Sequence, residues 1–177
     1  MKSEFLMRAL LLGLALLMGC SAALAAKRER ANWSGVVSHV VDGDTVKVRP
    51  AKGGKPISIR IEGIDAPEIC QTGGRVSRDA LKRRVLGKRV AVHGKTRDKY
   101  GRLVARIVLK GEDQGRWMVN QGQAWSYRHG RSDGPYAAEQ RRAKAAKRGV
   151  FAKNQARGLL YPADFRKKHG SCGFAAY

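Results

Sequence analysis

The sequence predicts an α+β fold in which five strands close a small barrel and about three helices pack around it. Five segments favour strands, the clearest of them alternate apolar and polar residues, and one helical segment follows the third strand while two more come late. Alternation gives each strand the single apolar face that a closed barrel needs. A β-sandwich is the competing architecture, and it would contain more strands and fewer helices.

The five strands are expected at residues 36–41, 45–49, 57–64, 88–93 and 103–109. The first is apolar and β-branched, and Asp42-Gly43-Asp44 supplies a turn before the second. The third, ISIRIEGI, places isoleucines on one face and Ser58, Arg60 and Glu62 on the other. The segments KRVAVH and LVARIVL complete the set, and five such strands fit a barrel of the OB type.

Helices are expected at residues 77–86, 116–121 and 136–148. Gly87 stops the first, and Gly149 closes the third after a Ser-Asp-Gly-Pro start. The segment AWSY reads as a short extended piece. We therefore expect a folded domain over residues 34–151, followed by a basic C-terminal tail, residues 152–177, whose local signals are weak.

Residues 1–25 are predicted to be a signal peptide. Lys2 and Arg8 give a basic start, the apolar run Ala9–Met18 is too short to span a bilayer, and Ala23–Ala25 forms an A-x-A cleavage site. The chain is thus expected to be exported, either periplasmic or secreted, with no stable membrane span. The alternative is a lipoprotein anchored at Cys20, since LMGC resembles a bacterial lipoprotein box.

The charge of the chain points to a polyanionic partner. The formal net charge is +22, yet residues 42–68 contain five acidic and five basic residues and are neutral, so the excess lies elsewhere. Such an excess favours nucleic acid. Charge alone leaves solubility or attraction to an anionic membrane as alternatives.

Two cysteines remain after the predicted cleavage, Cys70 and Cys172. In an exported protein such a pair favours a disulfide, with two buried thiols as the alternative. The bond would tie the C-terminal tail to the segment that follows the acidic residues.

Asp44 opens one predicted strand and Asp65 ends the next, so the two carboxylates can lie side by side. Two carboxylates a few ångströms apart repel unless a cation lies between them, and hard oxygen ligands select Ca²⁺ or Mg²⁺. Zinc is disfavoured because no two histidines stand at ligand spacing. The histidines are His39, His93, His129 and His169.

Basic residues near these acids suggest a phosphate site. A metal at Asp65 would hold a phosphate. Arg60 can reach that phosphate only if the chain bends between Arg60 and Asp65, and Gly63 permits such a kink. Arg102, in DKYGR, could supply a second guanidinium, which together with a cation would stabilise charge that develops on a phosphate. Glu68, behind the rigid Pro67, could deprotonate an attacking water.

Three blocks, VVDGDTVKV, IRIEGIDAPE and DKYGRLVARI, occur in the order seen in staphylococcal-nuclease-like (thermonuclease) domains. The resemblance covers roughly Val36 to Phe151. It implies an OB-fold barrel with three helices and Ca²⁺-dependent hydrolysis of DNA and RNA that leaves 3′-phosphate ends.

The resemblance also implies roles for residues that match the motifs. Asp44 and Asp65 resemble the Ca²⁺ carboxylates, and Ala66 stands where a threonine lends its backbone carbonyl to the metal. Arg60 and Arg102 resemble the phosphate-binding arginines, Glu68 the general base, and Tyr100 a tyrosine of the nucleotide pocket. A further pocket tyrosine corresponds to Trp125 or Tyr127, either of which could instead be core.

The sequence thus predicts an exported, monomeric, Ca²⁺-dependent endonuclease of DNA and RNA, with single strands preferred because a pocket that stacks a base needs it unpaired. The alternative is a catalytically weak OB-fold module that only binds nucleic acid. A cationic membrane-surface protein would explain the charge but none of the motifs.

Overall fold

In the computed structural model, residues 32–128, 130, 132–152, 159–170 and 172 are described. The predicted signal segment, Cys20 and His129 lie outside these residues. Five strands form the barrel: β1 (Trp33–Val40), β2 (Thr45–Pro50), β3 (Ile57–Ile61), β5 (Arg89–Arg97) and β6 (Leu103–Leu109). Neighbours pair antiparallel in the order β3-β2-β1-β5-β6, and a parallel pairing of β3 with β6 closes the barrel.

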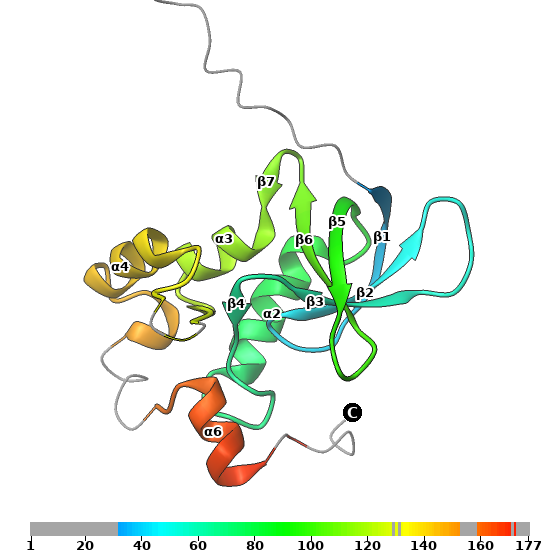
Figure 1. The fold of residues 1–177 in the computed structure, drawn as a ribbon. Coiled ribbons are helices and arrows are strands. Elements are labelled where there is room, and N and C mark those ends of the chain that lie inside the picture. The colour runs from blue at the N-terminus through cyan, green and yellow to red at the C-terminus, as the bar shows by residue number, and fades with distance from the viewer. Residues whose placement is uncertain (1–31, 129, 131, 153–158, 171, 173–177) are drawn as a thin grey trace, which may run out of the picture. The chain divides into compact units, whose positions relative to one another are not determined.

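Three shorter strands complete the β structure of the described chain. β7 (Glu112–Asp113) pairs with β6, and β4 (Ile64–Asp65) pairs antiparallel with β8 (Trp125–Ser126). The expected five-stranded barrel is therefore confirmed, and Figure 1 labels its strands β1, β2, β3, β5 and β6.

The interior of the barrel is filled by the alternating apolar residues that the sequence pattern indicated. Val46 and Val48 of β2 are fully buried while Lys47 between them is exposed, and Ile59 and Ile61 of β3 are buried on either side of Arg60. Because β-strand side chains point alternately to opposite faces, Lys47, Ser58 and Arg60 lie on the outer face of these strands.

The described residues contain four α-helices, one more than the three expected: α2 (Gly74–Val85), α3 (Gln114–Asn120), α4 (Ala137–Ala145) and α6 (Pro162–His169). A 3₁₀ turn, Gly149–Phe151, follows α4. α2 buries Leu81 and Val85 against the barrel core, and α3 buries Met118 and Val119 there. Among the described residues, no helix combines the length and apolarity needed to cross a membrane.

The unexpected helix, α6, lies in the segment that was predicted to be a tail with weak local signals. It starts with Pro162 at its first turn, a common start signal, and ends in four basic residues. α6 lies beside the loop that joins β4 to α2 (Figure 1). The C-terminal segment is thus part of the folded unit that contains the barrel, Ala31–Tyr177.

Candidate active site

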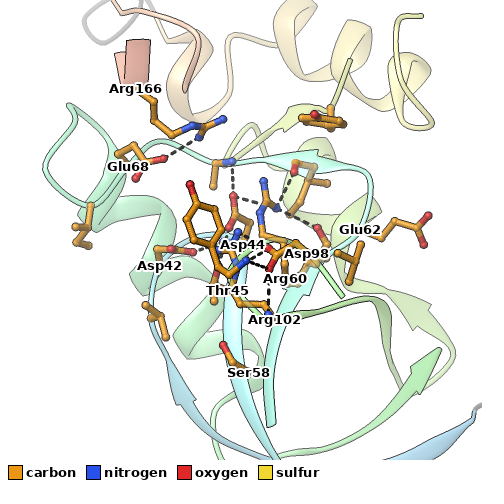
Figure 2. A pocket seen from close by; sticks show the side chains of 18 of the residues that line it. Asp42, Asp44, Thr45, Ser58, Arg60, Glu62, Glu68, Asp98, Arg102 and Arg166 are labelled. Atoms are coloured by element: carbon orange, nitrogen blue, oxygen red, sulfur yellow. Dashed lines mark hydrogen bonds and ion pairs between the residues drawn. The ribbon is translucent and has the colours of Figure 1, made fainter. Parts of the chain in front are cut away.

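A cavity of about 780 Å³ opens at one end of β2 and β3. Its wall comes from the start of β2, from β3, from the loop after β4, from the turn between β5 and β6, and from α6. The register explains this gathering, because Thr45 of β2 pairs with Arg60 of β3, and Arg60 pairs with Val104 of β6. Most of the predicted site residues therefore meet at one place (Figure 2).

Asp44 is held rigidly at the start of β2. Its Oδ1 accepts from the Thr45 hydroxyl at 2.9 Å, and its Oδ2 accepts from the Ala66 backbone N–H at 2.9 Å. Gly43 allows the close approach, because a Cβ there would lie 1.9 Å from Ser77 Oγ and 2.7 Å from Ala66 Cβ. The turn and the Asp65–Ala66 segment are thereby packed against each other.

Asp42, in the same turn, accepts from the Asp44 backbone N–H at 2.9 Å. Burial and the neighbouring charge of Asp44 raise the pKa of Asp42 to about 8. Its contact with the backbone shapes the turn that presents Asp44.

Arg60 joins the two predicted metal carboxylates. Its Nη1 lies 3.1 Å from Asp44 Oδ2, and its Nη2 donates to Asp65 Oδ1 at 3.0 Å. The bend expected between Arg60 and Asp65 is present: Gly63 has φ +77°, a value that favours glycine, and Arg60 reaches back to the Ile64 carbonyl at 2.8 Å. The bend brings residues five apart in sequence into contact.

Asp65 differs from expectation in its accessibility. A metal carboxylate is expected to be accessible from the site, but the relative exposure of Asp65 is 0% and it does not line the cavity. Both of its oxygens accept from guanidiniums, Oδ1 from Arg60 and Arg166 and Oδ2 from Arg166. Burial raises the pKa of Asp65, while its hydrogen bond to Arg166 and the charge of Arg60 oppose that rise.

Arg102 reaches the cavity from the turn between β5 and β6. Its Nε donates to Asp98 Oδ2 at 2.8 Å and its Nη1 to the Thr45 hydroxyl at 3.2 Å, so it is tied indirectly to Asp44. Burial works against the charge of Asp98, yet hydrogen bonds from the side chain and backbone of Arg102 lower the pKa of that carboxyl. Asp98 therefore stays ionised and fixes the arginine.

The two tyrosines offer aromatic surface at the rim of the cavity, and Trp125 does not. Tyr100 is 68% exposed, with the Arg102 guanidinium 5.3 Å from its ring centroid, and Tyr127 is 41% exposed. Trp125 is absent from the cavity wall and instead packs edge-on against Phe151 and Tyr161. Of the two candidates left open, Tyr127 therefore lines the cavity, while Trp125 packs against other aromatic rings.

Glu68 lines the cavity and is paired with an arginine that sequence reasoning missed. Its Oε1 accepts from Nη1 of Arg166 on α6 at 2.8 Å (Figure 2). Cys70 and Cys172 are joined by a disulfide, with their Cα atoms 5.8 Å apart. That pair was the signal that could have led to Arg166, because it places α6 beside the acidic loop.

The donor set fits a hard cation. Asp44 and Asp65 already share one cationic group, the Arg60 guanidinium, and the neighbouring residue Ala66 has a backbone carbonyl to offer. Among the described residues, no group of three or more His, Cys, Asp or Glu side chains converges as a metal cage. A Ca²⁺ or Mg²⁺ held by two carboxylates would complete its shell with water or substrate oxygens, as such ions commonly do.

Comparisons with known proteins point the same way as the geometry. The sequence model of the family described as "Staphylococcal nuclease homologue" matches residues 58–153. An "Uncharacterized endonuclease" of Haemophilus influenzae is 33% identical over 165 residues, covering 93% of this chain and 86% of that protein. A protein with the same description in Escherichia coli O157:H7 is 37% identical over 123 residues, 69% of this chain and 79% of its own length.

A "Probable staphylococcal-like nuclease" of Oryza sativa subsp. japonica is 37% identical over 94 residues, which are 53% of this chain and 25% of that protein. The family match covers more than half of the chain, and the bacterial relatives align over most of their own length. The chain belongs to the family of staphylococcal nuclease homologues.

Proposed function

We propose that this chain is an exported, Ca²⁺-dependent endonuclease that hydrolyses DNA and RNA and leaves 3′-phosphate ends. One observation carries the proposal: Asp44, Arg60, Glu68 and Arg102 line one cavity, and Asp65 lies directly behind it, bound to Arg60. A site that only bound phosphate would gain nothing from three carboxylates beside its anionic ligand, whereas a metal-dependent hydrolase needs them.

Asp44, Asp65 and the backbone carbonyl of Ala66 would hold the cation. When bound, Ca²⁺ would neutralise charge on the phosphate and polarise it toward attack. Because Arg60 and Arg166 cover the oxygens of Asp65, these guanidiniums must shift for a cation to reach that carboxylate. Arg60 would then be free to turn its donors toward the phosphate.

Arg60 approaches the cavity from β3 and Arg102 from the turn between β5 and β6, so two guanidiniums could contact one phosphodiester. Each donates to oxygens whose negative charge increases in the transition state. Glu68, at the opposite wall, would accept a proton from the attacking water. The exposed rings of Tyr100 and Tyr127 would stack against unpaired bases, which favours single-stranded substrate.

Export is proposed from the sequence of residues 1–25, and the Cys70–Cys172 disulfide suits an oxidising compartment. The lipoprotein anchored at Cys20 remains the alternative form of export. We propose that the chain acts as a monomer.

The test is cleavage of a labelled single-stranded DNA oligomer by the purified chain with Ca²⁺, with Mg²⁺ and with a chelator, followed by end-group analysis. We expect cleavage with Ca²⁺, none with chelator, and products that a polymerase extends only after phosphatase treatment. Products with free 3′-hydroxyls would refute the proposed chemistry, and cleavage in chelator would refute the metal requirement.

The second candidate is a catalytically weak module that binds nucleic acid. The observation that favours it is the burial of Asp65 beneath two guanidiniums, which keeps a cation away unless they move. Tight, salt-dependent binding of the oligomer without cleavage under any metal would support this candidate over the first.

A further inference from the structure

The C-terminal segment, residues 159–170 and Cys172, contacts the acidic loop at several points. Gln71, which accepts from the Glu68 backbone N–H through its side-chain oxygen at 3.2 Å, donates to the Leu160 carbonyl at 2.7 Å. The Cys70–Cys172 disulfide joins the same loop to the other end of the segment. Contacts at both ends hold α6 over the loop.

A further contact connects the C-terminal segment with Asp65 through Trp125. Tyr161, the residue before α6, packs edge-on against Trp125 with ring centroids 5.8 Å apart. Trp125 is the strand partner of Asp65. The C-terminal segment therefore supports both Asp65 of β4 and Glu68 of the loop that follows it.

Arg166 makes the direct link between these acids. Its Nη1 lies 2.8 Å from Glu68 Oε1 and 3.2 Å from Asp65 Oδ1, and its Nη2 lies 3.1 Å from Asp65 Oδ2. Burial opposes the charge on Arg166, but the hydrogen bonds to Asp65 and Glu68 raise its pKa. One guanidinium therefore fixes two carboxylates relative to each other through charge-assisted hydrogen bonds, which are strong and directional.

Glu68 needs such a partner to act at a defined place. Its side chain has three rotatable bonds, so the loop backbone alone does not set the position of the carboxylate. Among the described residues, the ion pair with Arg166 engages Oε1, which leaves Oε2 to accept from water.

We propose that Arg166 is a positioning residue that orients Glu68 for catalysis, and that the Cys70–Cys172 disulfide keeps Arg166 in place. This inference rests on the proposed nuclease function. It makes catalytic competence depend on a bond that forms in oxidising compartments, so the chain would reach full activity only after the disulfide has formed.

The first test compares wild type, Arg166→Ala, Arg166→Lys and the control Lys167→Ala. Lys167 is an exposed cation on the same helix, paired only loosely with Asp164 at 3.8 Å. At saturating Ca²⁺ we expect Arg166→Ala to lower kcat by ~10–100-fold, as for other residues that orient catalytic groups, with KM little changed. Arg166→Lys should recover part of the loss, because it restores the charge without the planar fork.

Calorimetric titration with Ca²⁺ provides a readout independent of turnover. Removing a positive charge next to Asp65 should leave Ca²⁺ affinity intact or make it tighter, while kcat falls. If Arg166 only supported the fold, Arg166→Ala would weaken Ca²⁺ binding and lower kcat together. If Arg166 obstructed the site, Arg166→Ala would raise kcat. Either of these results, or an unchanged kcat in Arg166→Ala, would overturn the proposal.

The second test removes the tether with the paired substitution Cys70→Ser and Cys172→Ser. In the wild-type background we expect the paired cysteine substitution to lower kcat. In the Arg166→Ala background we expect the same substitution to change kcat by less than ~3-fold, because substitutions that act through one interaction are not additive. Full additivity would show that the disulfide acts elsewhere. A wild-type chain that cleaves no nucleic acid would refute the proposed function, and this inference with it, whereas an active wild type with unaffected variants would refute this inference alone.

Discussion

Arg102→Ala is expected to lower the rate of catalysis strongly while lowering the stability of the fold only a little. The guanidinium of Arg102 is one of two placed to stabilise a phosphodiester transition state, and loss of one such donor is expected to lower kcat by on the order of a thousandfold, or ~4 kcal/mol. Its side-chain contacts in the folded chain include the hydrogen bonds to Asp98 and to the Thr45 hydroxyl and the packing of the guanidinium against the Tyr100 ring. Partly exposed bonds of this kind contribute ~0.5–1 kcal/mol each to stability.

The stability cost of Arg102→Ala is therefore modest. Thr45 keeps its hydrogen bond to Asp44, so no buried hydroxyl is left unpaired. For a domain of this size each kcal/mol lowers Tm by ~2–4 °C, which leaves the variant folded at assay temperature.

The assay is the initial rate of cleavage of a single-stranded oligomer at saturating Ca²⁺, with Tm measured on the same preparations. Arg97→Ala is the matched control, because Arg97 ends β5 next to the same turn but donates to the Gly101 carbonyl. We expect the control to retain kcat within a few-fold. A merely few-fold decrease in Arg102→Ala, similar to the control, would refute the role of Arg102 in the transition state.

Three further predictions concern the base, the turn and the basic surface. Glu68→Gln should keep oligomer affinity by fluorescence anisotropy while turnover falls ~10²–10⁴-fold, and unaltered turnover would remove Glu68 from the mechanism. Gly43→Ala should lower the free energy of unfolding by ~1–3 kcal/mol in urea titrations, because its Cβ would lie 1.9 Å from Ser77 Oγ; full stability would mean that the turn has room to move. Neutralising Arg141 and Lys144, both exposed on α4, should reduce the slope of log affinity against log salt concentration. The expected reduction is ~0.7 for each phosphate of a single strand that these side chains neutralise. An unchanged slope would mean that this face of α4 does not bind the nucleic acid.

The barrel could be predicted because its strands carry strong local signals. Segments such as Thr45–Pro50 and Leu103–Leu109 alternate in burial as their sequences alternate in polarity. The two-residue strands β4, β7 and β8 are too short to show any period, so their pairing was not predictable. α2 begins at Gly74, three residues before its predicted start, within the usual uncertainty of a helix boundary.

α6 was missed because more than half of its residues are charged or histidine and no apolar period marks its buried side. The start and end signals were present, with Pro162 in the first turn and basic residues from Arg166 to His169 in the last. The contact of Arg166 with Asp65 joins residues 101 apart. Local patterns carry no information about such a contact, and only the cysteine pair hinted at it.

Within the site, sequence spacing indicated which residues meet but not how exposed they are. The bend at Gly63 and the approach of Arg60 to Asp65 followed from the strand geometry. One of the groups that bind the carboxylate of Asp65 is Arg166, which lies 101 residues further along the chain. Trp125 and Tyr127 could not be told apart because β8 ends at Ser126, between them, and the course of the chain beyond it decides which ring reaches the cavity.

Calcium titration of three chains by calorimetry tests the proposed cation site most directly. Wild type is compared with Asp44→Asn, which removes one carboxylate charge from the site, and with Asp79→Asn, which removes a carboxylate paired with Arg78 on α2. We expect Asp44→Asn to weaken Ca²⁺ binding by at least ~10-fold and Asp79→Asn to leave it unchanged. Equal Ca²⁺ affinity in all three chains would contradict a catalytic cation at Asp44 and Asp65.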